Sequence, residues 1–318
     1  MKSIGLTTYG INVRDNENME FELHNIYGKT LIDIMEEFAR DNFRIYEDDK
    51  SDESVFTYDE IRKEKIQNSK GQDSYDVLFL RIKTGEYGTE SEIVDSKTGK
   101  TAFLREVSQA DVLPFGCCIT VPCGSFTGGV ITFQSLGRNG ITTLMKKRID
   151  SYLRSINPNL RVVMGAIVPR VYMERYLNDG ILQSLRLIRY VIPDEMAERL
   201  GVDNNGVKGM IEERVIRKPR GFIRHRIDDI KACMAGTKRF DEIVSIEDFE
   251  IDDLKLDFKL GKRSKTISMR NLDNIIAAED ITDDVESDNG NPIFDSLTEI
   301  MKETAEFYLK AKGLLLIE

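Results

Sequence analysis

The spacing of apolar positions divides the first part of the chain into strands and a helix. Alternating apolar and polar residues predict a strand over 4–13, and apolar positions three and four apart predict a half-buried helix over 29–41. The polar and charged stretch at 48–71 indicates a surface excursion with one short strand at 55–58. A strongly apolar run then predicts the first buried strand at 75–83.

Two apolar runs near the middle of the chain predict a central pair of strands. The segments PFGCCITVP and GGVITFQS are joined by a Gly-containing connection, which is typical of paired strands. Residues 141–156 then repeat apolar positions along one helical face. This helix should end at Asn157, because the residue before a proline is driven out of helical geometry.

The rest of the sequence alternates between extended and helical patterns and predicts an α+β protein with mixed sheets and flanking helices. An acidic stretch at 278–291 predicts a mobile segment before the last helix. The predicted elements are a strand at 161–168, a helix from Pro169, a strand at 181–191, a helix from Pro193, a helix at 221–236, strands at 240–244 and 249–260, and a helix at 292–312.

The length of 318 residues and a change of composition near residue 157 predict two domains. The first would be an N-terminal α+β domain at 1–157. The second, at 158–318, would be an α+β domain with the basic clusters and the C-terminal helix.

Composition excludes several kinds of protein and site. The apolar runs are too short to span a bilayer, and four cysteines do not form a disulfide framework, so we expect a reduced, cytoplasmic protein. Two histidines exclude a multi-histidine metal site, and the cysteine spacings do not form zinc knuckles. We therefore expect neither a metal nor a cofactor. The two histidines are His24 and His225, and the four cysteines are Cys117, Cys118, Cys123 and Cys233.

Charge is distributed unevenly along a chain whose net charge is −10. Residues 141–231 contain 18 Lys and Arg against 11 Asp and Glu, a net charge of +7. The rest of the chain therefore has a net charge of −17. This polarity can steer a polyanion to one face of a protein that is acidic as a whole.

Three basic clusters are candidates for contact with nucleic-acid phosphates, which arginine in particular binds through two parallel hydrogen bonds. The alternative is that these residues form solvated faces and pair with nearby acids, among them Glu212, Glu213, Asp228 and Asp229. The candidate residues are Lys146, Lys147 and Arg148; then Arg217, Lys218, Arg220, Arg224 and Arg226; and finally Lys262, Arg263 and Lys265.

A second hypothesis is a magnesium-dependent nuclease. Asp257 and Lys259 form a D-x-K pair, and Asp253 lies just upstream; such enzymes need two carboxylates that converge on Mg²⁺. Here all three residues fall on one predicted strand, without the usual hairpin between them, and a solvated strand face explains the pattern more simply.

Three segments of the chain have a common likeness: GGVITFQSLGRNGITTLMKKRIDSYL, LQSLRLIRYVIPDEMAERLG and FKLGKRSKTISM. They resemble the RexA-type phage-exclusion proteins, which are DNA-binding components of abortive infection. The resemblance implies a two-domain α+β protein that forms a homodimer and binds DNA without strong sequence preference. It transfers no catalytic residue.

The first hypothesis is therefore a cytoplasmic, non-enzymatic nucleic-acid-binding component of a bacterial or prophage anti-phage defence system. The alternatives are the nuclease and a scaffold whose acidic segment and C-terminal helix bind another protein.

Overall fold

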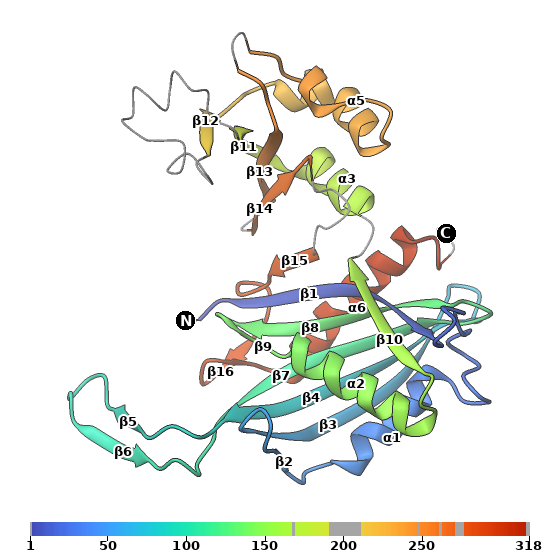
Figure 1. Cartoon of the computed structure of the whole chain (residues 1–318), viewed down its shortest axis with the longest axis vertical. Helices are drawn as coiled ribbons and strands as arrows, with labels where there is room; N and C mark the ends of the chain where they lie inside the picture. The colour runs from blue at the N-terminus through green and yellow to red at the C-terminus, as the bar shows by residue number, and fades with distance from the viewer. Residues whose placement is uncertain are drawn as a thin grey trace. The chain divides into compact units, whose positions relative to one another are not determined.

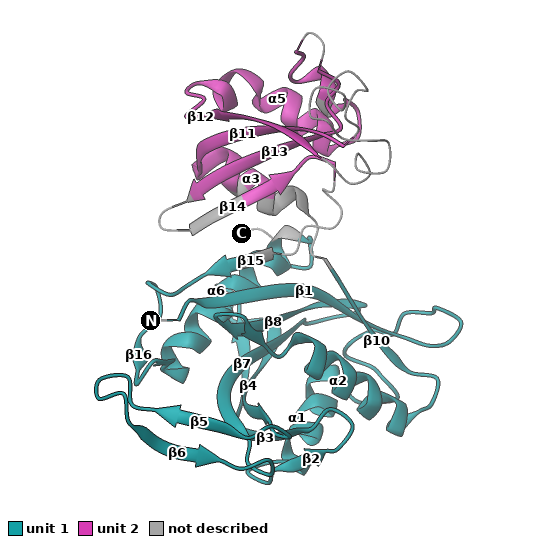
Figure 2. Ribbon diagram, turned by 60° about the vertical axis from the view of Figure 1, so that its left-hand side comes forward, with its two compact units in different colours: residues 1–167, 278–318 teal, residues 168–277 magenta. Residues whose placement is uncertain are grey.

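The computed structural model confirms the α+β class, with helices flanking several sheets (Figure 1). It describes residues 2–166, 169–190, 211–246, 249–260, 263–270 and 277–315. The chain forms two compact units: unit 1 comprises Met1–Ile167 and Ala278–Glu318, and unit 2 comprises Val168–Ala277 (Figure 2). Among the described helices, none combines the length and the apolar character that crossing a membrane requires.

Unit 1 is built on a large sheet in which the neighbouring strands of the main order are antiparallel. Two further strands, β15 (Ala277–Asp280) and β9 (Asn139–Gly140), pair with β1 and β8 respectively. In spatial order the main strands are β10 (Arg161–Ala166), β1 (Ile4–Arg14), β8 (Gly128–Leu136), β7 (Asp111–Pro122), β4 (Asp73–Glu86), β3 (Ser54–Gln67) and β2 (Glu47–Asp49). Two small hairpins, β5–β6 (Ser91–Val94, Thr101–Arg105) and β16–β17 (Ser287–Asp288, Asn291–Pro292), complete the unit.

Both faces of the middle strands are buried, which explains why their sequences are continuously apolar rather than alternating. Leu80 lies opposite Cys117, and the next pair, Phe79 and Cys118, points to the other face; all four are at most 1% exposed. Helix α1 (Leu31–Asp41) contacts β3, β4 and β7, and helix α6 (Phe294–Ala311) contacts β4, β7 and β8. In Figure 1, α1 and α2 lie in front of the sheet and α6 behind it.

The predicted helices begin and end for identifiable local reasons. The Thr30 hydroxyl accepts a hydrogen bond from the Asp33 amide (3.0 Å) and caps α1. Helix α2 (Thr142–Ile156) ends at Asn157, as the following proline predicts. The rings of Phe38 in α1 and Tyr152 in α2 stack at 4.7 Å, so the two helices pack against each other.

Two segments of unit 1 differ from the sequence prediction. The predicted surface excursion contains β3, 14 residues long, whose charged residues Arg62 and Glu64 pair with Asp295 (2.8 Å) and Lys302 (3.2 Å) of α6. The acidic stretch at 278–291 packs against β1 instead of forming a free segment, because it carries buried apolar residues such as Ile281. In both segments, contacts with residues distant in the sequence stabilise an ordered structure that the polar local sequence does not predict.

Unit 2 has an antiparallel four-stranded sheet in the order β12 (Glu212–Arg217), β11 (Ile181–Arg189), β13 (Asp253–Leu260) and β14 (Arg263–Ser268). Leu254, Leu256 and Phe258 are buried on its apolar face. The ring centroid of Tyr176, in helix α3 (Pro169–Asp179), lies 6.1 Å from that of Phe258. Helix α5 (Phe222–Met234) follows β12 and contacts α3. The alternation of polar and apolar residues along β13 therefore reflects one covered and one polar face.

Two strands predicted in this unit differ from the structure, and one predicted helix cannot be compared with it. The segment predicted as a strand at 240–244 contains a short 3-10 helix, Phe240–Glu242, and the strand predicted at 249–260 begins only at Asp253. The helix predicted from Pro193 lies outside the described residues.

The division into units also differs from the predicted boundary at 157/158. Strand β10 pairs with β1 from Arg161 to Ala166, and α6 covers the sheet of unit 1. Unit 2 is therefore inserted between two parts of unit 1. The change of composition near residue 157 marks the end of α2, whereas the unit boundary is set by pairing between distant strands.

Candidate nucleic-acid interface

The second basic cluster lies on a turn between β12 and α5 and on the first turns of α5. We call Arg217, Lys218, Arg220, Arg224 and Arg226 the β12–α5 cluster. The Lys218 amide donates a hydrogen bond to the Gln183 carbonyl of the neighbouring strand (2.7 Å), and the Arg220 amide donates one to the Lys218 carbonyl (2.8 Å). The backbone that carries these side chains is therefore held to the sheet.

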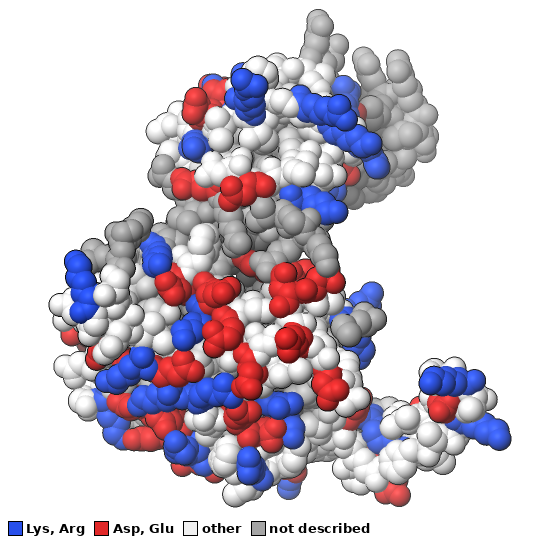
Figure 3. Space-filling model, turned by 180° about the vertical axis from the view of Figure 1, so that it is seen from behind, with Lys and Arg blue, Asp and Glu red and all other residues white. Residues whose placement is uncertain are grey.

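Local charge is concentrated at this turn. Unit 2 as a whole contains 21 Lys and Arg against 19 Asp and Glu, whereas residues 214–227 contain five arginines, one lysine and no acid. Every member of the β12–α5 cluster is exposed. Figure 3 shows acidic and basic side chains mixed across the displayed face of unit 1, and both kinds are also visible on unit 2.

The acids before the cluster pair with other cations. Glu213 pairs with Arg186 of β11 (3.2 Å). Glu212 accepts a hydrogen bond from the Arg189 Nε atom (3.1 Å) and pairs with Arg214 (3.3 Å). Burial disfavours ionisation of Glu212, but the bonds from Arg189 and Arg214 outweigh it, so the pKa of Glu212 is lowered. Both carboxylates are therefore paired with cations outside the β12–α5 cluster.

The acids after the cluster neutralise one of its members. Asp229 binds Lys238 (2.6 Å) and Arg226 (3.0 Å), and these hydrogen bonds lower the pKa of Asp229. Asp228 is exposed and forms no ion pair with the cluster. Within the described part of the chain, four members have no acidic partner: Arg217, Lys218, Arg220 and Arg224.

The start of α5 adds to the positive potential of this turn. Gly221 is the N-cap residue, with a φ of 81°, and a glycine has no side chain that could cap the first turn. The first amide groups of a helix point toward its N-terminus, where they and the helix dipole favour an anion. Lys218 also has a positive φ, 52°, which directs the chain into this tight turn.

The first basic cluster is held by acids of its own unit. The Lys147 Nζ atom lies 2.6 Å from Asp52 and 3.5 Å from Asp49. The Arg148 side chain is only 9% exposed; its guanidinium binds Glu47 (2.8 Å). Lys146 alone is exposed without an ion pair among the described residues. Arg148 is therefore a structural residue, and Lys147 is largely neutralised.

We expect Arg148→Ala to lower the free energy of unfolding by about 2 kcal/mol, because its guanidinium also covers the Phe56 ring at 4.2 Å. Denaturation by urea measures this change. Lys146→Ala, on the exposed side of the same helix, should change stability by less than about 0.5 kcal/mol. Equal effects of the two substitutions would contradict the structural role of Arg148.

The third basic cluster is described only in part. Arg263 and Lys265 lie on β14, opposite Leu260 and Phe258 of β13. Lys262 lies outside the described residues.

The proposed nuclease residues lie on the polar face of β13 but do not converge. Asp253 and Asp257 are four residues apart on one strand, so about 13 Å separates them. Asp253 is buried and accepts hydrogen bonds from the Ser268 hydroxyl (2.8 Å) and the Arg270 amide (3.1 Å). A distance of this size does not allow both carboxylates to bind one Mg²⁺ ion.

The second carboxylate is also engaged in structural contacts. Asp257 accepts hydrogen bonds from Ser184 and Thr266 on the two neighbouring strands, and Arg186 lies 3.2 Å away. Lys259 is exposed near the end of the strand. These contacts join three strands of the sheet and leave the nuclease hypothesis without a common metal position.

Sequence reasoning missed one cation near the interface, Lys255. It lies on the polar face of β13, opposite Arg186 of β11, and the same face carries Arg217, which lies opposite Ser184. The alternation along β13 identifies the face of Lys255, but only the register between strands places it beside Arg186.

Comparison with known proteins adds no family. No protein-family model matches the chain, and a search of curated proteins finds no match. Similar solved structures include the crystal structure of a PDZ domain protein from Parabacteroides distasonis ATCC 8503. It is 8% identical over 88% of this chain and 74% of the other, with a TM-score of 0.11. A TM-score of this size does not indicate a shared fold.

Proposed function

We propose that this protein binds the phosphate backbone of a nucleic acid through the β12–α5 cluster. The observation that carries the proposal is the group of four exposed cations at the start of α5, which have no acidic partner among the described residues. Phosphates are held by such cations and by helix N-termini, which supply position and affinity but no sequence information. The expected ligand is therefore a nucleic acid of any sequence, and the resemblance to RexA-type proteins favours DNA.

The biological setting of the proposal comes from the resemblance to RexA-type proteins. From this resemblance we propose that the protein acts in the cytoplasm, in anti-phage defence, as a homodimer. Neither the defence role nor the dimer is needed for the binding chemistry, so the two can be tested separately.

The triple variant Arg217→Gln, Lys218→Gln, Arg220→Gln tests the binding surface. Each lost phosphate contact should make the free energy of binding less favourable by roughly 1 kcal/mol. Three such losses weaken binding on the order of a hundredfold. The slope of log K against log salt should fall by about 0.9 for each lost contact. Fluorescence anisotropy with several unrelated duplexes, at a series of salt concentrations, measures both quantities.

A matched control removes the same charge elsewhere. Lys70, Lys97 and Lys100 are exposed in unit 1 and form no ion pairs with described residues, so their triple substitution by Gln should leave most of the affinity intact. Lys146→Gln with Lys147→Gln should also have a small effect. If the control triple weakens binding as much as the cluster triple, overall charge and not this surface explains the affinity. A strong preference for one duplex would also contradict the proposal.

A further inference from the structure

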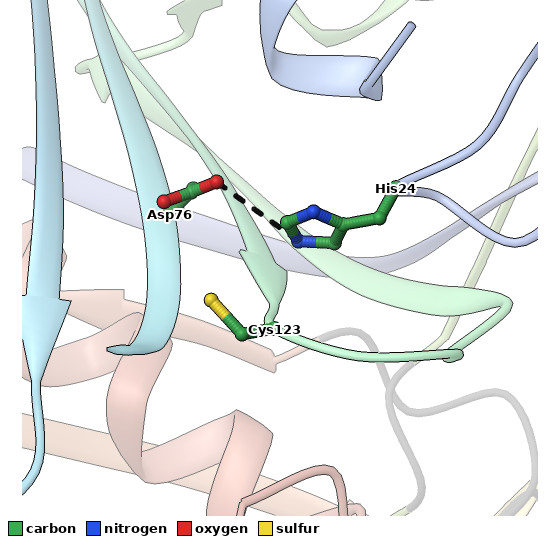
Figure 4. A group of neighbouring side chains, drawn as sticks. All are labelled: His24, Asp76 and Cys123. Carbon is green, nitrogen blue, oxygen red and sulfur yellow. Dashed lines mark ion pairs between the residues drawn. The ribbon is translucent and has the colours of Figure 1, made fainter. Parts of the chain in front are cut away.

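Three potential metal ligands from distant parts of the sequence converge in unit 1. They are His24, in the turn after β1; Asp76, on β4; and Cys123, directly after β7 (Figure 4). One ligand atom from each residue lies within 4.8 Å of the others, and the His24 Nε2 atom is 3.9 Å from an Asp76 carboxylate oxygen. Figure 4 shows the three side chains pointing toward a common space.

The backbone holds these residues in place. The amide of Leu23, next to His24, donates to the Phe126 carbonyl (2.8 Å), and the Leu23 carbonyl accepts from the Leu31 amide (2.7 Å). The Cys123 amide donates to the Ser74 carbonyl of β4 (2.9 Å). Asp76 itself lies in the β4–β7 ladder, opposite Val121. All three ligands are thus carried by backbone that is hydrogen-bonded to the sheet or to its connections.

One atom of each of two of these residues is buried without a hydrogen-bond partner among the described residues. These atoms are Asp76 Oδ1 and His24 Nε2. Asp76 is only 4% exposed, and a buried carboxylate without a partner is costly. The 3.9 Å separation between histidine and aspartate is too long for a hydrogen bond. A cation bound between His24 Nε2 and Asp76 Oδ2 would give the histidine nitrogen a partner and would offset the charge of the buried carboxylate.

The environment does not favour a catalytic thiol at Cys123. Burial first, and then the negative charges of Asp76 and Asp73, raise the pKa of the Cys123 thiol. Nucleophilic cysteines instead have a lowered pKa. A bound metal would instead favour the thiolate form of Cys123, because a coordinating thiol loses its proton to solvent.

We propose that His24, Asp76 and Cys123 form a binding site for a divalent transition metal of the Zn²⁺ class. A nitrogen, an oxygen and a sulfur ligand suit zinc and its neighbours rather than Mg²⁺ or Ca²⁺. Three protein ligands leave one position of a tetrahedral site for a further ligand. The His24 side chain is 24% exposed, so solvent reaches this side of the site.

The geometry requires only a small contraction. In a tetrahedral zinc site with bonds of about 2.0–2.3 Å, ligand atoms lie about 3.3–3.6 Å apart. The ligand atoms lie within 4.8 Å of one another, so metal binding would draw them together by up to about 1.5 Å, through rotation of the three side chains. The bound ion would join the turn at His24 to β4 and to the end of β7, and would stabilise unit 1 by binding the folded state.

Cobalt(II) provides a direct probe of the site. The full chain, freed of metal with EDTA, should bind one equivalent of Co²⁺ with a thiolate-to-cobalt charge-transfer band that Zn²⁺ abolishes by displacement. Cys123→Ser should remove this band and weaken binding at least tenfold. His24→Gln should retain the band but also weaken binding at least tenfold, because it removes a ligand other than the thiol.

Cys233→Ser is the matched control, since Cys233 is a half-buried thiol in unit 2. It should bind as the wild type does. Thermal unfolding with and without Zn²⁺ gives a second readout: the midpoint should rise for the wild type and for Cys233→Ser, but not for Cys123→Ser. Absence of the band in the wild type, or its persistence in Cys123→Ser, would overturn the proposal. The site lies in unit 1, so its failure leaves the nucleic-acid proposal for unit 2 unaffected.

Discussion

A fragment of residues 1–157 should show no cooperative unfolding transition, although the composition of the sequence marks it as a domain. The fragment lacks α6, which covers one face of the sheet of unit 1. Five large α6 side chains are at most 5% exposed: Phe294, Leu297, Met301, Tyr308 and Leu309. At about 2 kcal/mol for each buried side chain, the loss is about 10 kcal/mol. This loss is as large as the whole stability of a typical domain, about 5–15 kcal/mol.

The contact between α6 and the sheet is close as well as apolar. A Cβ atom at Gly116 of β7 would lie 2.6 Å from the Leu297 side chain and 3.1 Å from that of Met301. Without α6, β7 and β4 would expose this face to water. The fragment also lacks β10, which pairs with one edge of β1. Calorimetry and circular dichroism would measure whether a transition remains.

A control fragment restores the missing parts without unit 2. Residues 1–166 would be joined to 277–318 by a Gly/Ser linker of about ten residues, whose root-mean-square span is about 17 Å. Ala166 lies opposite Tyr9, and the Glu279 carbonyl lies beside Gly5, so the linker bridges about four strand positions or 13 Å. This fragment should unfold cooperatively. A folded 1–157 fragment would show that α6 is not part of the core of unit 1.

Asp253→Ala should lower the stability of unit 2 by about 3 kcal/mol. The carboxylate is 1% exposed and accepts hydrogen bonds from the Ser268 hydroxyl and the Arg270 amide. Removal of the acceptor leaves these donors without their partner, at about 1–3 kcal/mol for each buried group. Urea denaturation, followed by a probe in unit 2, measures the change.

Asp228→Ala is the matched control, because Asp228 is exposed on α5 and forms no ion pair with described residues. Its stability should stay within about 0.5 kcal/mol of the wild type. The comparison also tests the nuclease hypothesis. If the wild type cleaves DNA with Mg²⁺, and Asp253→Asn abolishes cleavage at unchanged stability, then the role of Asp253 is catalytic and not structural.

Local patterns in the sequence determine most of the helices and several strands. The helices at 31–41, 142–156, 222–234 and 294–311 follow from apolar spacing and from boundary residues such as Pro158, both of which act within a few positions of the chain. The same reasoning places the buried runs of β4, β7 and β8, and hence the α+β class. Local patterns predict too short a strand at β3, because its charged residues form ion pairs with Asp295 and Lys302 of α6, more than 200 residues away.

The candidate sites depend on the tertiary structure to different degrees. The sequence locates every basic cluster, but only the fold distinguishes Arg148, which is buried against Phe56, from Arg217 and Arg220, which are exposed and form no ion pair with a described residue. A cluster is a local property, whereas its neutralisation depends on which distant acids lie beside it.

The proposed metal site is the clearest case of a feature decided by tertiary structure alone. The scarcity of histidines and the spacing of the cysteines predict no metal site, because such patterns detect ligands that are close in sequence. His24, Asp76 and Cys123 lie in three separate segments; pairing of β4 with β7 brings Asp76 near Cys123, and the hydrogen bond from the Leu23 amide to the Phe126 carbonyl holds the turn of His24 beside them. The sequence therefore determines which ligands exist, and the contacts between distant segments determine that they meet.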